Sequence, residues 1–271
     1  MFEAFSLLGL TALGAFIVLS LTYFIAEKIQ NAGIVDVVWS FSFSTILASW
    51  AFTSYLQGNT VSTAFLILLI MVILHSGRLG TYIFRRTVGH LAQEDSRYAS
   101  LRKAWPKWGF FLMFQMQGLL ILILTSPFLS ALPIQHFILS IGLAAGLFIF
   151  GLGLIGETVA DRQLEIFKRN NQQPGALLNT GLWRVSRHPN YFFHWLSWLG
   201  ISICGISLTG NFWFSVQPLL MWFILTKMSG VRFTEELMLE KRGEAYRQYQ
   251  QQTPAFSPSL SKLFSRSRST P

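Results

Sequence analysis

The chain alternates between long apolar runs and short polar segments over almost its whole length. Each run approaches the roughly 20 residues that a helix needs to cross the hydrocarbon core of a bilayer. The pattern predicts an all-α fold, a polytopic membrane bundle of about seven transmembrane helices. The last run is short, and we expect its helix to extend into the polar segment after it. The predicted spans are Phe5–Ile25, Val37–Leu56, Val61–Gly77, Gly109–Thr125, Ile134–Gly156, Tyr191–Leu208 and Phe212–Thr226.

The ends of the chain differ in character. The first apolar run is too long for a signal-peptide core and has no basic segment before it, so we expect a retained helix. Residues 257–271 are rich in Ser, Pro and Arg, which predicts a disordered basic tail after a single transmembrane domain of residues 1–256. The one cysteine, Cys204, lies in an apolar run, so neither an internal disulfide nor a cysteine metal site is predicted.

Charge predicts the orientation. All 21 Lys and Arg residues fall in segments that alternating spans place on one side of the membrane. The opposite loops, Gln57–Thr60, Ser126–Pro133 and Thr209–Asn211, contain no charged residue. By the inside-positive rule, the N-terminus lies outside and the C-terminus in the cytoplasm. Orientation, contact with the lipid bilayer and a phosphorylated ligand can account for the net charge of +9, so no nucleic-acid partner is expected.

A basic segment, Arg184–Tyr191, directly precedes the sixth run. Pro189 suits the first residue of a helix, where its missing N–H is not needed. The free N–H groups and the positive end of that helix would face Arg184, Arg187 and His188, an arrangement that binds anions, phosphates especially. A basic loop that only anchors a membrane helix explains the same residues equally well.

Polar residues at the second and third runs are the next candidates. Asp36 suits a cap or first-turn position, and Trp39 suits an interfacial anchor; the alternative is a carboxylate facing an internal cavity. His75, Arg78 and Tyr82 share one helical face at steps of three and four. Arg78 alone would extend to the headgroups, whereas the three together can polarise a carbonyl or supply a proton.

Three carboxylates, Glu157, Asp161 and Glu165, recur every four residues after the fifth run. A solvated helix face is the usual interpretation of such a stripe. Glu157 follows the apolar run directly, however, where a carboxylate needs a partner. Arg184 and Arg187 are candidates, as are the ribose hydroxyls or the carboxamide of a ligand.

Two further polar segments contain acids and bases at helical spacing. Glu94–Arg102 predicts an amphipathic helix lying on the cytoplasmic membrane surface. After the last run, the adjacent acids Glu235 and Glu236 precede Tyr246 and Tyr249. These side chains could close over a cofactor, or they could cover the loops from below.

Five motifs together resemble one family, the bacterial DUF1295 branch of the steroid 5α-reductase-like membrane proteins. The resemblance runs from about Gly33 to Pro258. Isoprenylcysteine carboxyl methyltransferases, distant relatives, carry a similar Arg-His-Pro stretch, but the Asp-x-x-Trp and Glu-x-x-x-Asp elements favour the reductases. The motifs are Gly33-x-Val35-Asp36-x-x-Trp39, Glu94-Asp95-x-Arg97-Tyr98, Gly156-Glu157-x-x-x-Asp161-x-Gln163-Leu164, Gly181-Leu182-Trp183-Arg184 through Arg187-His188-Pro189-Asn190-Tyr191, and Tyr246-x-x-Tyr249 followed by Pro254.

The resemblance implies a multi-pass oxidoreductase of the bacterial inner membrane, in lipid metabolism. It would bind NADPH from the cytoplasm and reduce a hydrophobic small-molecule enone that enters from lipid. Asp161 and Asn190 match the family's cofactor-binding aspartate and asparagine, and Glu157 stands where the reductases have an asparagine. The expected cofactor-binding residues are Glu157, Asp161, Arg184, Arg187, His188, Asn190, Tyr191, Arg232, Glu235, Glu236 and Tyr246.

The chain also departs from the reductases, which place a glutamate and a tyrosine at the substrate carbonyl. Aligned on Arg78, His75 takes the place of the tyrosine; Asp36 is the nearest acid, and Glu235 replaces a histidine. These changes leave NADPH in place and disfavour a steroid substrate. The alternatives are a methyltransferase that uses S-adenosylmethionine on a lipidic acceptor and a non-enzymatic membrane binding protein. The expected catalytic residues are His75, Asp36 and Tyr82, and the expected substrate-binding residues are Trp39 and Arg78.

Overall fold

The computed structural model describes residues 2–134, 139–171, 175–228 and 230–259, and within these ranges the regular structure is entirely helical. The predicted all-α fold is confirmed. The chain divides into two compact units: Met1–Leu143 with Cys204–Phe214, and Ala144–Ile203 with Ser215–Pro271. The expectation of a single transmembrane domain stays a prediction. Residues 260–271, most of the predicted disordered tail, lie outside the described residues.

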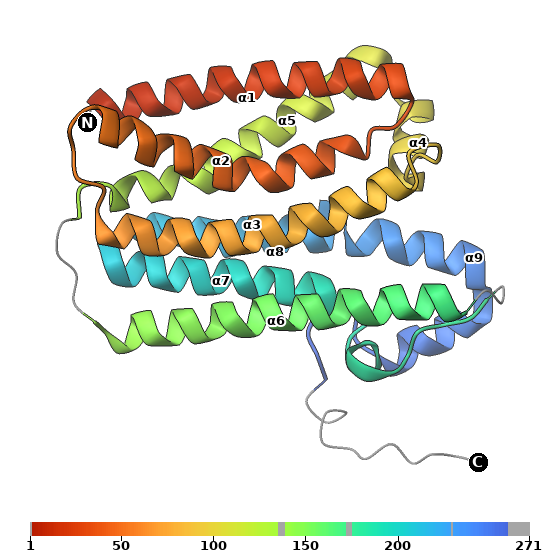
Figure 1. The fold of residues 1–271 in the computed structure, drawn as a ribbon. Helices are drawn as coiled ribbons and strands as arrows, with labels where there is room; N and C mark the ends of the chain where they lie inside the picture. Colours follow the sequence, from red (N-terminus) through yellow and green to blue (C-terminus); the bar gives the residue numbers. More distant parts are fainter. Residues whose placement is uncertain (1, 135–138, 172–174, 229, 260–271) are drawn as a thin grey trace. The chain divides into compact units, whose positions relative to one another are not determined.

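The first unit is built mainly from the N-terminal helices (Figure 1). In it α2 packs against α1, α3 and α5, and α1 also packs against α5. Aromatic rings fill the core: Tyr23 meets Phe111 and Phe114 edge to face, with ring centroids 5.2 and 5.5 Å apart. The helices are α1 (Phe2–Ile29), α2 (Ile34–Leu56), α3 (Thr63–Gly89), α4 (Ser96–Ala104) and α5 (Lys107–Thr125).

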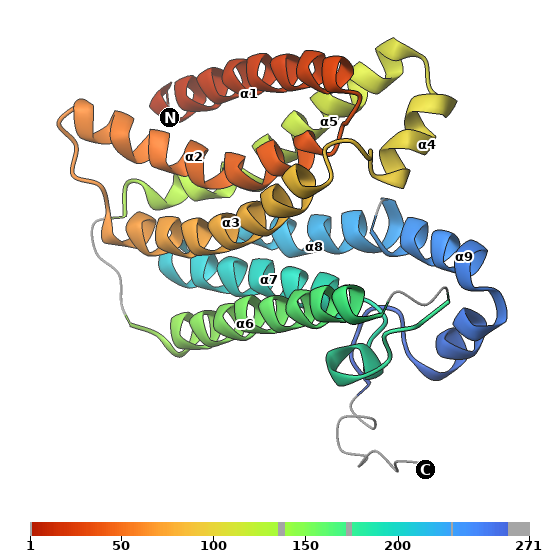
Figure 2. The same cartoon turned by 45° about the vertical axis from the view of Figure 1, so that its right-hand side comes forward.

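In the second unit α6 and α7 run side by side, as Figures 1 and 2 both show. Helix α7 begins at Pro189, as predicted. The Trp195 indole donates to the carbonyl of Pro218 at 2.9 Å and so joins α7 to α8. The helices are α6 (Ile141–Asn170), α7 (Pro189–Thr209), α8 (Val216–Phe223) and α9 (Val231–Gln252).

Six helices of the described chain are long and apolar enough to cross a membrane, and they correspond to the first six predicted spans. The fifth differs at its start, because residues 135–138 of that predicted span lie outside the described residues and α6 begins at Ile141. Exposed apolar side chains on α1, such as Leu13, Phe16 and Phe24, are those expected of a lipid-facing surface. The orientation of the termini stays a prediction.

The seventh predicted span, Phe212–Thr226, is helical throughout, but the type of helix changes along it. A 3₁₀ helix (Phe212–Ser215), α8 and a π-helix (Ile224–Met228) follow one another, and Gly230 precedes α9. No single one of these pieces has both the length and the apolar character of a spanning helix. The sequence pattern therefore predicted helix over this span correctly, and the helix is not a single α-helix.

Candidate functional site

The segment before α7 is anchored to the end of α6. Gly181 has a φ of +58°, a conformation that favours glycine, and begins a 3₁₀ helix that ends at Arg184. The backbone N–H of Leu182 donates to the Gln163 side chain at 3.0 Å, and the Trp183 indole donates to the carbonyl of Ala160 at 3.1 Å. Two of the motifs that carried the family resemblance are thus in direct contact.

Glu235 is the centre of a hydrogen-bonded cluster that holds the Arg187–His188 segment against α9. Arg187 donates to both carboxylate oxygens, through Nε at 3.0 Å and Nη2 at 2.7 Å. His188 Nε2, the Tyr246 hydroxyl and the Gln250 amide lie 2.7, 2.6 and 2.7 Å from the same carboxylate. The side chains of Arg187 and Glu235 are only 9% and 13% exposed, so the ion pair is largely shielded from water.

These contacts determine the ionisation of Glu235. Burial by itself would raise the pKa of this carboxyl, but the bonds from His188, Arg187, Tyr246 and Gln250 outweigh burial and hold its pKa well below its ordinary value. Burial, together with the bond to the Glu235 carboxylate, raises the pKa of the Tyr246 hydroxyl. Glu235 is therefore a carboxylate at neutral pH, and Tyr246 is a neutral donor to it.

The other Arg187 donors also bind the protein. Nη1 donates to the carbonyl of Gln250 at 3.0 Å and to the carbonyl of Thr253. One of the two interpretations of the sequence made Arg187 a ligand for an anion, whereas the structure directs its guanidinium towards α9. Arg187 thus fixes the loop that leads into α7.

The chain after α9 returns to the same loop. The N–H groups of Arg187 and His188 donate to the carbonyls of Pro254 and Ala255 at 3.0 and 3.1 Å, and Ser259 donates to the carbonyl of Val185 at 2.9 Å. Residues 257–259 of the predicted tail are therefore placed by contacts with this loop. The loop is held from α6, from α9 and from the segment after α9.

Two polar pairs connect α6 to α7. The Asn190 amide donates to Asp161 at 3.1 Å, and His194 Nδ1 lies 3.2 Å from Glu157 Oε1. Glu157 and Asp161 are four residues apart on α6, and Asn190 and His194 are four residues apart on α7. The two pairs therefore occupy successive turns of two antiparallel helices. Glu157 and Asp161 are buried, and the solvated-face interpretation is wrong for both; Glu165 fits it, since it pairs with Arg169 on the surface. The sequence pattern did not single out His194 as the partner of Glu157.

Close contact between α6 and α7 holds these pairs in place. A Cβ added at Gly153 would lie 2.5 Å from the backbone nitrogen of Ser197 and 2.9 Å from the carbonyl oxygen of Phe193. Neither backbone atom can move aside as a side-chain end would. Glycine is thus required at this close approach of the two helices.

We expect Gly153→Ala to destabilise the second unit by about 1–3 kcal/mol, because it overpacks two helix backbones. Gly151→Ala is the matched control on the same helix, since a Cβ there meets nothing within 4 Å. The control should be neutral or stabilising by up to about 1 kcal/mol. Thermal unfolding in detergent compares the two, and equal stability of the variants would contradict the close contact.

The remaining candidates in the second unit lie around the cluster or away from it. The Tyr191 ring stacks on His188, with centroids 5.5 Å apart. Arg184 is half-buried at the end of its 3₁₀ helix. Arg232 and Glu236 pair with each other at 3.2 Å on the exposed face of α9, so they do not join the Glu235 cluster.

In the first unit Asp36 is bound by α4. Arg97 donates to its carboxylate at 3.1 Å, and the Tyr98 hydroxyl donates to it as well. Arg97 also binds Asp95, whose side chain caps α4 by accepting from the Arg97 N–H. Both the predicted first-turn position of Asp36 in α2 and the helix around Tyr98 are confirmed.

The α4 helix connects other elements of the first unit, which the prediction of an amphipathic surface helix did not include. Arg102 donates to Glu94 at 2.9 Å and binds Glu27 at the end of α1, and Glu94 also accepts from the backbone N–H of Ala32 at 2.9 Å. Acids and bases that were expected on a membrane-surface helix therefore connect α4 to the end of α1 and to the segment before α2.

His75, Arg78 and Tyr82 follow one another along α3. His75 is buried, and the Arg78 guanidinium lies over the Tyr82 ring, 5.6 Å from its centroid. The Trp39 ring on α2 meets Phe43 edge to face at 4.7 Å. Of the three residues predicted to share a face of α3, Arg78 and Tyr82 are in direct contact. The chemical roles of all three stay predictions.

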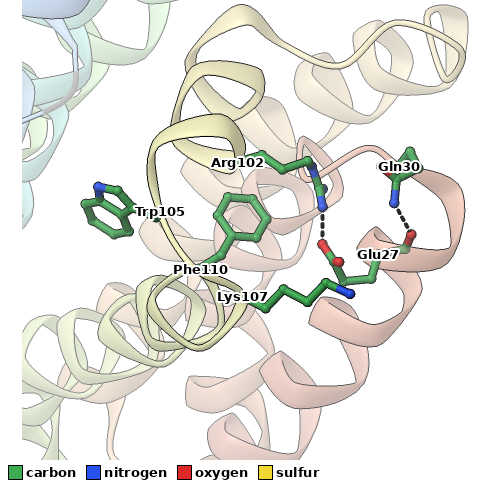
Figure 3. Close-up of a pocket in the computed structure, with 6 residues that line it drawn as sticks. All are labelled: Glu27, Gln30, Arg102, Trp105, Lys107 and Phe110. Carbon is green, nitrogen blue, oxygen red and sulfur yellow. Dashed lines mark hydrogen bonds and ion pairs between the residues drawn. The ribbon is translucent and has the colours of Figure 1, made fainter.

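A pocket opens at the end of α1 in the first unit, and Figure 3 shows it. The Arg102 guanidinium points towards Glu27 and lies 4.7 Å from the centre of the Phe110 ring. None of the candidate catalytic or cofactor-binding residues lines it. Its lining residues are Glu27, Gln30, Arg102, Trp105, Lys107 and Phe110.

The apolar helices and the buried polar pairs define a helical, multi-pass membrane protein. Residues 22–253 match the family described as "Protein of unknown function (DUF1295)", and the chain belongs to this family. The resemblance noted in the motifs is thereby confirmed at the level of the family. A bacterial origin stays a prediction.

Two relatives are similar to the chain. It is 27% identical over 264 residues to an uncharacterized protein of Schizosaccharomyces pombe, covering 85% of this chain and 74% of that protein. It is 38% identical over 66 residues to "Probable O-methyltransferase ustE" of Ustilaginoidea virens. That second match covers 24% of this chain and spans only 23% of the relative. No solved structure gives a significant match.

Proposed function

We propose that the chain is a membrane-embedded, NADPH-dependent reductase of a hydrophobic enone. The observation that carries the proposal is the Asp161–Asn190 pair, 3.1 Å apart at the start of α7 and beside the anchored basic loop. A buried carboxylate and a half-buried amide together offer acceptors and donors for ribose hydroxyls or for a carboxamide. The resemblance to the steroid 5α-reductase-like proteins implies that the cofactor-binding aspartate and asparagine of the reductases correspond to these two positions.

The donor set fits the nucleoside part of such a cofactor. For the phosphates, Arg184 is the better candidate, because the Arg187 guanidinium is bound by Glu235 and two carbonyls. Arg187 and His188 would shape the loop, and the α7 N-terminus would add its dipole. NADPH, when bound, supplies a hydride to an electron-poor carbon. His75, Asp36 and Tyr82 remain the candidates for substrate chemistry, with Trp39 and Arg78 as substrate-binding residues.

We expect Asn190→Ala and Asp161→Ala each to weaken NADPH binding by about 1.5–3 kcal/mol, as for hydrogen bonds to charged groups. Calorimetry on purified protein in detergent measures the change. Arg169→Ala is the control, since Arg169 lies on the exposed face of α6 in a pair with Glu165. Affinity unchanged in both site variants would remove the pair from the cofactor site.

A methyltransferase is the second candidate function. The observation that favours it is the printed name of the relative that is similar over 66 residues. In that case the same pair would bind the ribose of S-adenosylmethionine, and the acceptor would be lipidic. Titration with both cofactors distinguishes the two candidates.

A further inference from the structure

The Glu157–His194 pair is a second buried ionisable pair in the second unit, and the proposed cofactor site makes no use of His194. Oε1 and Nδ1 are 3.2 Å apart, and the two side chains are 3% and 7% exposed. Ionisable groups at membrane depth are rare and usually functional. An imidazole beside a carboxylate between two apolar helices is therefore a candidate for a functional role. The simpler interpretation is a hydrogen bond that only joins α6 to α7.

The position of the pair points to chemistry near the cofactor site. It lies one helical turn from Asp161 on α6 and one turn from Asn190 on α7, a displacement of roughly 5–6 Å. The turn leads towards Gly153 and Ser197, into the apolar parts of both helices. A hydrophobic substrate of the proposed reductase would be expected on this side of the Asp161–Asn190 pair.

We propose that His194 is a catalytic proton donor and that Glu157 is the positioning residue that orients it. This inference rests on the proposed function. Glu157 would accept from Nδ1–H and so fix the orientation and the tautomer of the ring, as a buried carboxylate does for histidine in hydrolase triads. The second ring nitrogen, Nε2, then carries the proton that is transferred.

In the proposed step, the β-carbon of the enone would receive a hydride from the bound donor, whose own C–H bond breaks. The carbon–carbon π bond of the enone would break, and an enolate would remain. The enolate electron pair takes the Nε2 proton of His194 and forms the C–H bond at the α-carbon. His194 is left as a neutral imidazole, which regains a proton from water.

His194→Asn separates proton donation from helix joining. The Asn amide can still donate to Glu157, but it cannot act as an acid at neutral pH. We expect unchanged thermal stability and NADPH affinity, with turnover lowered by about 10²–10⁴-fold, the usual contribution of general acid catalysis. Thr158→Ala, an exposed neighbour of Glu157, is the control and should keep full turnover.

A second measurement is independent of turnover. Nitrogen NMR of histidine-labelled protein should show a proton on Nδ1 of His194, and the signal is identified by its loss in His194→Asn. In Glu157→Gln this Nδ1–H signal should shift, because its charged acceptor is gone. A spectrum with the proton on Nε2 alone would overturn the proposed orientation.

The outcomes also separate the two proposals. If the wild-type protein binds NADPH and reduces an enone, and His194→Asn is equally active, only the proposed role of His194 is overturned. A wild-type protein that binds no NADPH would overturn the proposed function together with this inference.

Discussion

Glu235→Ala is expected to destabilise the second unit by about 3–5 kcal/mol, the usual consequence of removing one partner from a buried ion pair. Arg187 and His188, both largely shielded from water, would lose the carboxylate that binds them. The hydroxyl of Tyr246 and the amide of Gln250 would lose the same acceptor. Thermal or denaturant unfolding in detergent measures the loss.

Glu236→Ala is the matched control for this variant. Glu236 adjoins Glu235 on α9, but its side chain is 60% exposed and pairs only at the surface with Arg232. Surface substitutions of this kind usually change stability by no more than about 0.5 kcal/mol. If both variants unfold alike, the Glu235 cluster does not stabilise the loop before α7.

His75→Phe is expected to lower turnover by about 10²–10³-fold, the usual effect of losing one donor to an oxyanion. Hydride addition to an enone leaves negative charge on the carbonyl oxygen. A histidine donor at that oxygen would stabilise it, and phenylalanine fills a similar volume without donating. NADPH affinity should not change, because the expected cofactor residues are on other helices. Turnover with an enone substrate is the measurement.

Ser76→Ala controls for local loosening of α3. The Ser76 hydroxyl donates to the carbonyl of Ser40 on α2 at 2.7 Å, and both residues are buried. The control loses a bond between helices at the adjacent position but no candidate catalytic group. A His75→Phe variant that is folded and as active as the control would exclude His75 as the donor at the carbonyl oxygen and leave Asp36 or Tyr82 as the candidates for that role.

The sequence predicts the helices well because each long apolar run must satisfy its backbone within one helix in lipid. The start of α7 is also predictable, since Pro189 both fits the first turn and follows the basic segment. The interruption before α9 is not, because Gly230 and the π-helix disturb a run whose hydropathy is continuous. Hydropathy predicts where a helix is favourable, and it does not predict where one stops.

The sequence predicted which residues belong to the candidate site better than it predicted which of them pair with one another. Asp161 and Asn190 were both candidates, and the structure brings them together from positions 29 residues apart. Arg187 was a candidate for binding a ligand anion, whereas its guanidinium pairs with the carboxylate of Glu235, which lies 48 residues further along the chain. His194 was not singled out, because its partner Glu157 lies on another helix, 37 residues earlier in the chain.

The most direct test of the central claim is calorimetric titration of the purified wild-type protein with NADPH and, separately, with S-adenosylmethionine. Affinity for NADPH that is lost in Asp161→Ala is the result that the proposed reductase predicts. Binding of S-adenosylmethionine with no binding of NADPH would contradict the reductase and favour the methyltransferase.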